Sequence, residues 1–269
     1  MSSLLAIVTS DAALVRCELD RVRPLVTLDA PGLVAGVGAY QDDLVLQRRY
    51  GVGAAAELWE VPLSEMVLLH AGPLPVDLAP EDNAQPFRFR QWLFAHVGEV
   101  DRADAVRDRL FEQLPEYLQS AVRGGTLSEV IFAQFLAELR SVGRTEDPTL
   151  DGPMAASLLK KAARAVEQAS GEVGGTSKAK LALVATNGRV LVAARRGQQA
   201  LAYRLLEGRA ECARCGIAAD AKESEAAVRD HRRRRSVVLA SSPTAGDGWG
   251  SVPDGGVLSV DRRLSLQVG

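Results

Sequence analysis

The sequence predicts an α+β fold in which strands come first, helices fill the middle and strands return at the end. Apolar runs at 4–8 and 33–40 suit buried strands, whereas 101–170 carries apolar residues at helical spacing. Near the start of the last third, Asn187-Gly188 separates two apolar runs, which is a strong signal for a β-hairpin. Because strands and helices are segregated along the chain, the pattern favours α+β over alternating βαβ units.

The first hundred residues are expected to be mostly strands. The segments expected to be extended are 4–8, 33–40, 44–48, two strands within 57–70, and 92–97. Residues 41–43 form the turn of a hairpin. One helical stretch, with apolar residues from Leu14 to Leu25, is expected to end at Ala30-Pro31-Gly32. A proline-spaced loop at 73–86 leads into the 92–97 strand.

Three helices are expected in the middle of the chain. The first covers Asp101 to Gln113. Thr126 and Glu129 have the spacing of a capping box and open a helix over 128–142. Asp151-Gly152-Pro153 begins a third helix that runs to Ser170. After a glycine-rich connection, the remaining strands are expected at 181–186, 190–194, 200–206, 237–240, 257–260 and 264–268.

Composition restricts the class of protein. The length of 269 residues is enough to bury a large core, and we expect one domain over 1–269. The hydrophobic share of 47% and the charged share of 25% are typical of a water-soluble protein. A net charge of −2 gives no general attraction to nucleic acid or to anionic lipid. Without a signal core or a long apolar run, we expect a cytoplasmic protein without nucleic-acid or membrane partners.

Residues 86–98 read PFRFRQWLFAHVG and resemble the PF(R)…WLFAHNG segment of the class II glutamine amidotransferases. Three further stretches resemble the same family in the same order. Residues 1–6 are similar to its MCRLLA start, 124–132 to its G-x-TDSE-x-x-F helix opening, and 239–261 to its ASEP…W…VP…VVD segment. The resemblance implies the family fold, an N-terminal-nucleophile (Ntn) hydrolase-like αββα sandwich of two antiparallel sheets between helix layers.

The resemblance also implies which positions of this chain correspond to the family's catalytic set. The family's N-terminal Cys attacks the glutamine amide with its own α-amino group as base, and Ser2 stands there. The Arg that binds the substrate carboxylate is replaced by Gly72. The Asn and Gly of the oxyanion hole correspond to Val97 and Gly98, and Leu127 replaces the Asp that holds the substrate ammonium.

These replacements predict that glutamine is no longer the substrate. Losing one oxyanion-hole donor alone costs about 100- to 1,000-fold in rate, and both charged ends of glutamine also lose their partners. We therefore expect a catalytically inactive pseudoenzyme that needs no cofactor and binds another protein or has a regulatory role. Two alternatives stay open. The chain is either an N-terminal-serine hydrolase that uses Ser2 on another amide, or a small-molecule sensor that uses the remodelled pocket.

A CxxC motif, Cys212 and Cys215, precedes His231 and is the weak candidate for a metal site. Three ligands are one short of a structural zinc site, so no metal is expected. Cys17 supplies a fourth ligand only if the fold brings it close. The other two histidines, His70 and His96, are expected to be buried structural residues with satisfied hydrogen bonds.

Four consecutive arginines, Arg232, Arg233, Arg234 and Arg235, are the best candidate for an electrostatic docking site. The competing interpretation is a solvated face or a helix end, because acidic residues flank the run.

Overall fold

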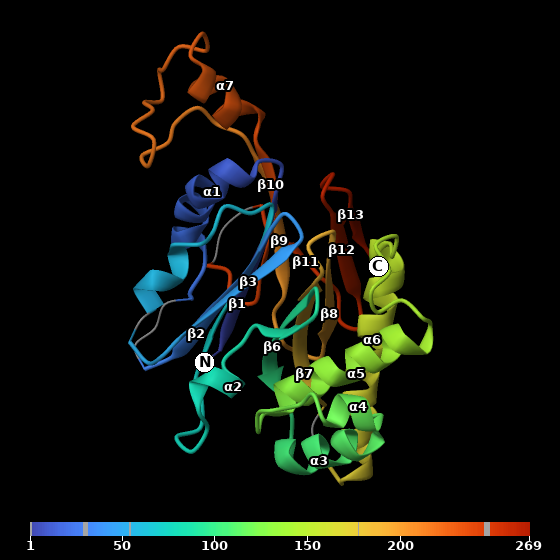
Figure 1. Ribbon diagram of the computed structural model, residues 1–269. Helices are drawn as coiled ribbons and strands as arrows, with labels where there is room; N and C mark the ends of the chain where they lie inside the picture. Colours follow the sequence, from blue (N-terminus) through green and yellow to red (C-terminus); the bar gives the residue numbers. More distant parts are fainter. Residues whose placement is uncertain (1, 29–31, 54, 177, 245–247) are drawn as a thin grey trace.

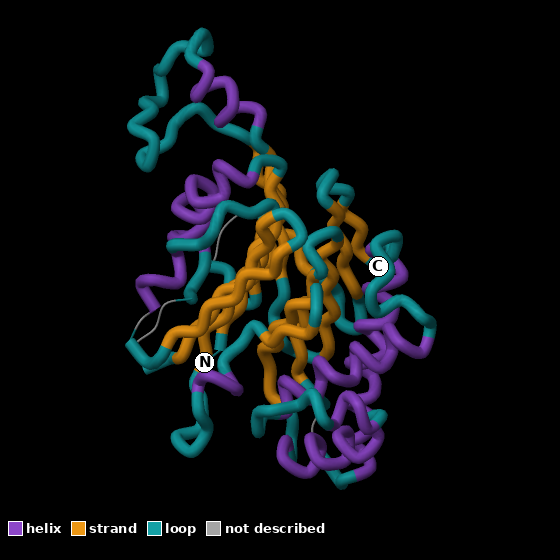
Figure 2. The backbone as a smooth tube through the Cα atoms, in the orientation of Figure 1, coloured by secondary structure: helices purple, strands orange, loops and turns teal. Residues whose placement is uncertain are grey.

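Two antiparallel β-sheets lie face to face, and helices cover both outer sides (Figure 1). The computed structural model describes residues 2–28, 32–53, 55–176, 178–244 and 248–269. Figure 2 shows the strands gathered at the centre of the molecule and the helices at its periphery. This arrangement confirms the expected α+β class and the four-layer αββα order.

The first sheet has seven strands among the described residues. Their spatial order is β11 (Gly250–Ser251), β9 (Ala202–Glu207), β10 (Arg235–Ala240), β1 (Ser3–Thr9), β4 (Met66–Gly72), β2 (Val34–Gln41) and β3 (Leu44–Tyr50). The strand at the start of the chain therefore lies at the centre of the sheet. Leu5 of β1 faces Ala240 on one side and Leu69 on the other.

The second sheet has six strands in the part of the chain that the structure describes. Their order is β13 (Leu266–Val268), β12 (Val257–Asp261), β8 (Val190–Arg196), β7 (Lys180–Thr186), β6 (Trp92–Glu99) and β5 (Phe87–Phe89). Gly188 forms the β7–β8 turn at φ +79°, and the Asn187 side chain accepts hydrogen bonds from the two following amides of the turn. The expected Asn-Gly hairpin is thus confirmed.

Helices form the outer layers. On the first sheet lie α1 (Val15–Val22) and three 3-10 turns, η1 (Ala12–Leu14), η2 (Arg23–Leu25) and η3 (Ala55–Trp59). On the second lie α3 (Ala103–Gln113), α4 (Glu116–Gln119), α5 (Leu127–Ser141) and α6 (Gly152–Glu172). Two more helices belong to connections, α2 (Pro80–Asn83) and α7 (Ala226–Arg233). No helix in the described ranges is long and apolar enough to cross a bilayer.

Alternation of side chains along the strands separates the core into three apolar layers. In β6, Leu93, Ala95 and Val97 pack between the two sheets. The intervening Trp92 and Phe94 pack on the opposite face against the helices, where Phe94 stacks on Phe132 with ring centroids 5.2 Å apart. A third cluster joins α1 to the outer face of the first sheet. The strand that carries the FAHVG motif, β6, therefore has apolar partners on both faces.

Some sequence expectations need correction. Residues 57–70 contain one strand, β4, and not two, because Leu58 and Trp59 bury their side chains from a 3-10 turn. The short helices α2, α4 and α7 and the strand β11 were not anticipated. The three long helices begin within two residues of the expected positions, with Thr126 and Asp151 as N-caps. The expected stop at Ala30-Pro31-Gly32 falls partly outside the described residues.

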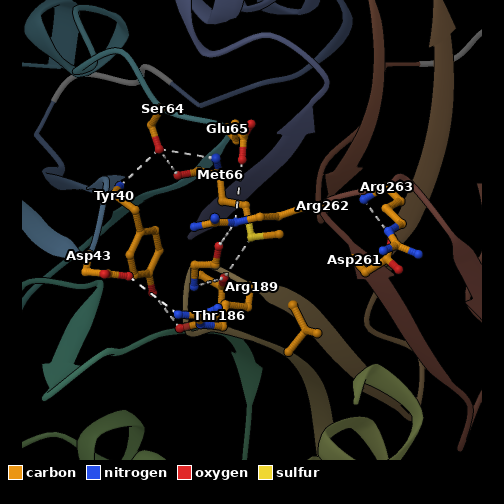
Figure 3. Close-up of polar contacts among 12 residues, drawn as sticks. Tyr40, Asp43, Ser64, Glu65, Met66, Thr186, Arg189, Asp261, Arg262 and Arg263 are labelled. Atoms are coloured by element: carbon orange, nitrogen blue, oxygen red, sulfur yellow. Dashed lines mark hydrogen bonds and ion pairs between the residues drawn. The ribbon is translucent and has the colours of Figure 1, made fainter. Parts of the chain in front are cut away.

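A buried tyrosine joins the two sheets near one end (Figure 3). The Tyr40 hydroxyl donates to the backbone carbonyl of Thr186 at 2.6 Å and lies 2.8 Å from that of Gln91. Its backbone N–H donates to the Ser64 hydroxyl at 3.0 Å. Thr186 in turn lies 3.4 Å from the sulfur of Met66 on β4. Tyr40 thus satisfies backbone acceptors of the second sheet from a strand of the first.

Removing this hydroxyl tests the connection. We expect Tyr40→Phe to lower the free energy of unfolding by about 1–3 kcal/mol, because buried carbonyls lose their donor while the ring stays in place. Urea denaturation monitored by circular dichroism measures the loss. Tyr117→Phe is the matched control, since the Tyr117 side chain is exposed. Equal stability of both variants would contradict a clamping role for Tyr40.

Candidate functional site

Ser2 and Gly72 lie side by side at the ends of the central strands. Ser3 pairs with Ala71 in the β1–β4 ladder, so the residues that flank this pair approach each other. A Cβ atom built on Gly72 would lie 2.7 Å from Ser2 Oγ and 2.9 Å from His70 Cε1. Ordinary contacts between such atoms are well over 3 Å. The space where a side chain at position 72 would begin is therefore filled by Ser2 and His70.

Val97 and Gly98 end the buried part of β6. The Val97 side chain is 4% exposed and belongs to the apolar layer between the sheets. Gly98 has φ +156°, and a Cβ there would lie 1.8 Å from the carbonyl oxygen of Lys180 on β7. Backbone packing alone thus requires glycine at position 98, whether or not its N–H has a catalytic role.

Leu127 is the first residue of α5. The hydroxyl of the preceding Thr126 accepts a hydrogen bond from the Glu129 N–H at 3.4 Å, which caps the helix. The Leu127 side chain packs against the apolar layer between the second sheet and the helices. Val97 and Leu127 therefore belong to apolar layers on opposite faces of the second sheet.

Two buried histidines lie next to these positions. His96 Nδ1 is 2.9 Å from Ser128 Oγ on α5, and the backbone N–H of His96 donates to Gln85 Oε1 at 2.6 Å. His70 is buried as expected, but neither ring nitrogen makes a well-aligned hydrogen bond to a described residue. The expectation of a satisfied His70 is met only by a poorly aligned contact with the His96 backbone.

Burial keeps both imidazoles neutral. It lowers the pKa of His70 to about 3, with a smaller contribution from His96, and it lowers the pKa of His96 to about 4. A general base works best with a pKa near the operating pH. His70 is therefore a weak base for the adjacent Ser2, even though the two side chains flank the same glycine.

The loop that contains α2 closes over the start of α5. Asn83 Oδ1 accepts from the Gly125 N–H at 2.7 Å, and Asn83 Nδ2 donates to the Ala79 carbonyl at 2.9 Å. Glu129 accepts hydrogen bonds from the amides of Arg123 and Gly124 rather than from Thr126. The expected capping box is thus correct in its Thr126 half, while the glutamate reaches further back to fix the preceding turn.

The comparisons with known proteins agree with this architecture. The family model for class II glutamine amidotransferases matches residues 63–265, which is well over half of the chain. The chain belongs to this family. No curated protein sequence matches it.

Solved structures of amidotransferases share the fold. A glutamine aminotransferase class-II domain protein from Silicibacter pomeroyi aligns with 20% identity and a TM-score of 0.63, over 99% of this chain and 98% of the other. A protein described as a predicted glutamine amidotransferase from Pseudomonas aeruginosa aligns with 16% identity and a TM-score of 0.57, over 96% of both chains. The glutamine phosphoribosylpyrophosphate amidotransferase of B. subtilis aligns with 12% identity and a TM-score of 0.53, covering 99% of this chain and 48% of that one. These likenesses establish the Ntn-type sandwich.

A charged cleft of about 610 Å³ is lined in part by residues of β3, β5 and α5. Arg49 of β3 and Glu129 of α5 are among its lining residues, together with Asp82 of α2. Burial lowers the pKa of Arg49 and raises that of Glu129, so each charge is partly withdrawn from water. None of Ser2, Gly72, Val97, Gly98 and Leu127 lines this cleft. Arg49 was not predicted from the sequence, because a single arginine on an edge strand belongs to no recognisable motif.

The other residues singled out in the sequence, the cysteines, His231 and the arginine run, lie where the segment containing α7 meets α1. The structure brings Cys17 to the CxxC motif and His231, which meets the condition for a fourth ligand. Arg234 is turned inward, 2.6 Å from the buried carboxylate of Glu18, whereas Arg232, Arg233 and Arg235 are exposed. The prediction of a docking surface that includes all four arginines is therefore wrong, because Arg234 is not available to a partner.

Substituting the family's asparagine for Val97 tests whether position 97 faces the core. We expect Val97→Asn to lower the free energy of unfolding by about 2–4 kcal/mol, because an amide is buried between apolar side chains without a partner. Urea denaturation provides the measurement, and Val97→Thr, which keeps the side-chain shape with a smaller polar group, should cost less. Wild-type stability of Val97→Asn would instead indicate a polar pocket at this position.

The buried histidines predict a loss of stability in acid. In the unfolded chain both have a pKa of about 6.5, so below that pH the unfolded state binds protons that the folded state does not. Stability is complete above about pH 6.5 and falls by about 1.4 kcal/mol per pH unit for each histidine as the pH decreases toward the folded values. Thermal melts at pH 7.5, 6 and 5 measure this slope. His70→Leu should reduce it by about half, and an unchanged slope would contradict the assignment.

Proposed function

We propose that this member of the class II amidotransferase family has lost glutamine hydrolysis and functions by binding, with another protein as its partner. The observation that supports this most directly is the space at Gly72. Ser2 and His70 fill the position from which the family's arginine would reach the substrate carboxylate. An unpaired carboxylate in a desolvated pocket costs several kcal/mol, which disfavours glutamine binding.

The other family positions support the same proposal. Val97 offers no side-chain donor for an oxyanion, and Leu127 offers no acceptor for an ammonium group. Gly98 is explained by its contact with Lys180. A typical oxyanion hole needs donors about 3 Å from the developing charge, and the loss of one already costs about 100- to 1,000-fold in rate. Together the changes remove substrate binding as well as transition-state stabilisation.

We propose that the partner meets the chain in a reducing compartment such as the cytoplasm, since an odd number of cysteines, three, does not suggest a disulfide framework. Three arginines of the run are exposed: Arg232, Arg233 and Arg235. An acidic surface on the partner would complement their positive charge. Arg232 already has an acidic neighbour at 3.5 Å, Glu223, which a partner would have to replace.

The charged cleft supports a second binding function, as a sensor for a small molecule with both charges. Arg49 presents a buried Nε without a well-aligned hydrogen bond to a described residue. A carboxylate that accepts a hydrogen bond from Arg49 would satisfy this donor. Arg49→Gln should abolish any thermal stabilisation by such a ligand. A panel of free amino acids and dicarboxylates is the probe.

Glutamine hydrolysis on untagged protein tests the main proposal. Intact mass must confirm removal of Met1, and Ser2→Ala is the matched control. We expect no glutamate release above the Ser2→Ala background and no thermal stabilisation by millimolar glutamine. Ser2-dependent release would overturn the proposal and show that other residues replace the lost anchors.

The same protein addresses the alternative hydrolase. The N-terminal-serine mechanism needs a free α-amine on Ser2, so a tag that cannot be removed should abolish activity on any amide. Activity that depends on Ser2 and is lost on tagging would favour this alternative over the binding proposal.

A further inference from the structure

Four potential metal ligands converge where α7 and the preceding loop meet α1. We propose that Cys17, Cys212, Cys215 and His231 bind one structural zinc ion. The ligand atoms of these four residues all lie within 4.8 Å of one another. Cys17 Sγ and Cys215 Sγ are 3.5 Å apart. The residues come from three places in the sequence, so the fold alone assembles the set.

The spacing fits tetrahedral zinc. With Zn–S bonds of about 2.3 Å and Zn–N bonds of about 2.0–2.1 Å, neighbouring ligand atoms in a tetrahedron lie about 3.5–3.8 Å apart. The distance between Cys17 and Cys215 has this value, and the widest pair needs to move by no more than about 1 Å. Three thiolates and one imidazole form a closed structural set and favour zinc over magnesium or calcium.

His231 is oriented for coordination by its own helix. Its Nδ1 lies 2.8 Å from the carbonyl oxygen of Ala227, one turn earlier in α7, so Nδ1 carries the proton and donates it. Nε2 then has a free lone pair, and it is buried without a hydrogen-bond partner among the described residues. The side chain as a whole is 2% exposed. A buried nitrogen in this state is costly unless it accepts a proton or binds a metal.

The CxxC motif lies in a turn with its own backbone hydrogen bonds. Cys212 and Ile217 exchange two backbone hydrogen bonds of 3.0 and 2.9 Å, and the Gly216 N–H donates to the Ala213 carbonyl at 3.2 Å. Gly216 adopts φ +67°, a conformation that glycine reaches without strain. The turn therefore holds both cysteines in fixed positions on one short loop.

Arg214, between the two cysteines, fastens this turn to α1. Its Nε and Nη2 donate to the two carboxylate oxygens of Asp20 at 2.5 and 3.0 Å. Asp20 lies one turn of helix after Cys17. The same contact that docks the turn thus sets the third thiol beside the other two.

Few buried side chains anchor the projecting segment to the rest of the protein. Residues 208–234 connect β9 to β10 and extend beyond the end of the first sheet, above α1 in Figure 1. The structure describes this whole segment, and only Ala210, Cys212, Val228, His231 and Arg234 in it are buried. So few buried side chains do not offset the entropy of ordering about 27 residues. A metal that joins the segment to α1 supplies the missing stabilisation.

Metal analysis of the full-length protein tests the proposal. We expect about one zinc ion per chain after expression with zinc and extensive dialysis. Replacement by Co²⁺ should produce the visible bands of a tetrahedral, thiolate-ligated ion. Cys215→Ser is the informative variant, because Cys215 is exposed and the change leaves core packing intact. It should weaken Co²⁺ affinity at least tenfold, while Glu211→Gln, a neighbouring exposed carboxylate that is not a ligand, should leave it unchanged.

Three results would overturn the proposal. One is wild-type protein that retains no stoichiometric zinc and gives no tetrahedral Co²⁺ spectrum. Another is equal Co²⁺ affinity of Cys215→Ser and the wild type. The third is a disulfide between two of the cysteines in freshly purified protein, detected by mass spectrometry after alkylation. Because glutamine hydrolysis is measured separately, failure of the zinc site is distinguishable from failure of the proposed function.

Discussion

The face-to-face contact of the two sheets is the constraint on which the rest of the molecule depends. Every second residue of β1, β4, β6 and β7 points into this contact, so each must be apolar or find a partner inside it. Tyr40 is a large polar residue at this contact, and its hydroxyl reaches backbone carbonyls of Thr186 and Gln91. The positions that the sequence resemblance assigned to the family's catalytic set, Ser2, Gly72, Val97 and Gly98, lie at the ends of three of these strands.

This constraint explains how catalysis can be lost without loss of the fold. A polar group at position 97 is tolerated only while substrate, water or a neighbour satisfies it. Valine needs no such partner and adds to the apolar layer between the sheets. At Gly72 there is no room for a side chain, because Ser2 and His70 occupy the space. Burial also lowers the pKa of the two histidines nearby, His70 and His96, so both are uncharged at neutral pH.

Local patterns allowed most of the fold to be predicted from the sequence. Asn187-Gly188, Thr126 and Asp151 are signals that act over a few residues, and each produces the expected turn or cap. The second strand expected in 57–70 failed because apolar content alone does not distinguish a strand from a buried 3-10 turn.

Residues of the candidate site could be predicted from the sequence only where they belong to a recognisable motif. The neighbourhood of Ser2 and Gly72 followed from the family resemblance. The sequence could not show that Cys17 lies close to Cys212 and Cys215, because almost two hundred residues, including strands of both sheets, lie between them along the chain. The lack of well-aligned hydrogen bonds from His70 to the described residues was equally hidden, since it depends on which strands surround β4.

Most residues of the motif at 92–98 have a structural role. Trp92 and Phe94 pack on α5, Leu93 and Ala95 on the opposite sheet, and Gly98 avoids a collision with the backbone of β7. All of these requirements are architectural, and they persist under selection for folding alone. A signature built on such residues identifies descent and shape, and it will keep identifying them in descendants that no longer perform the ancestral reaction.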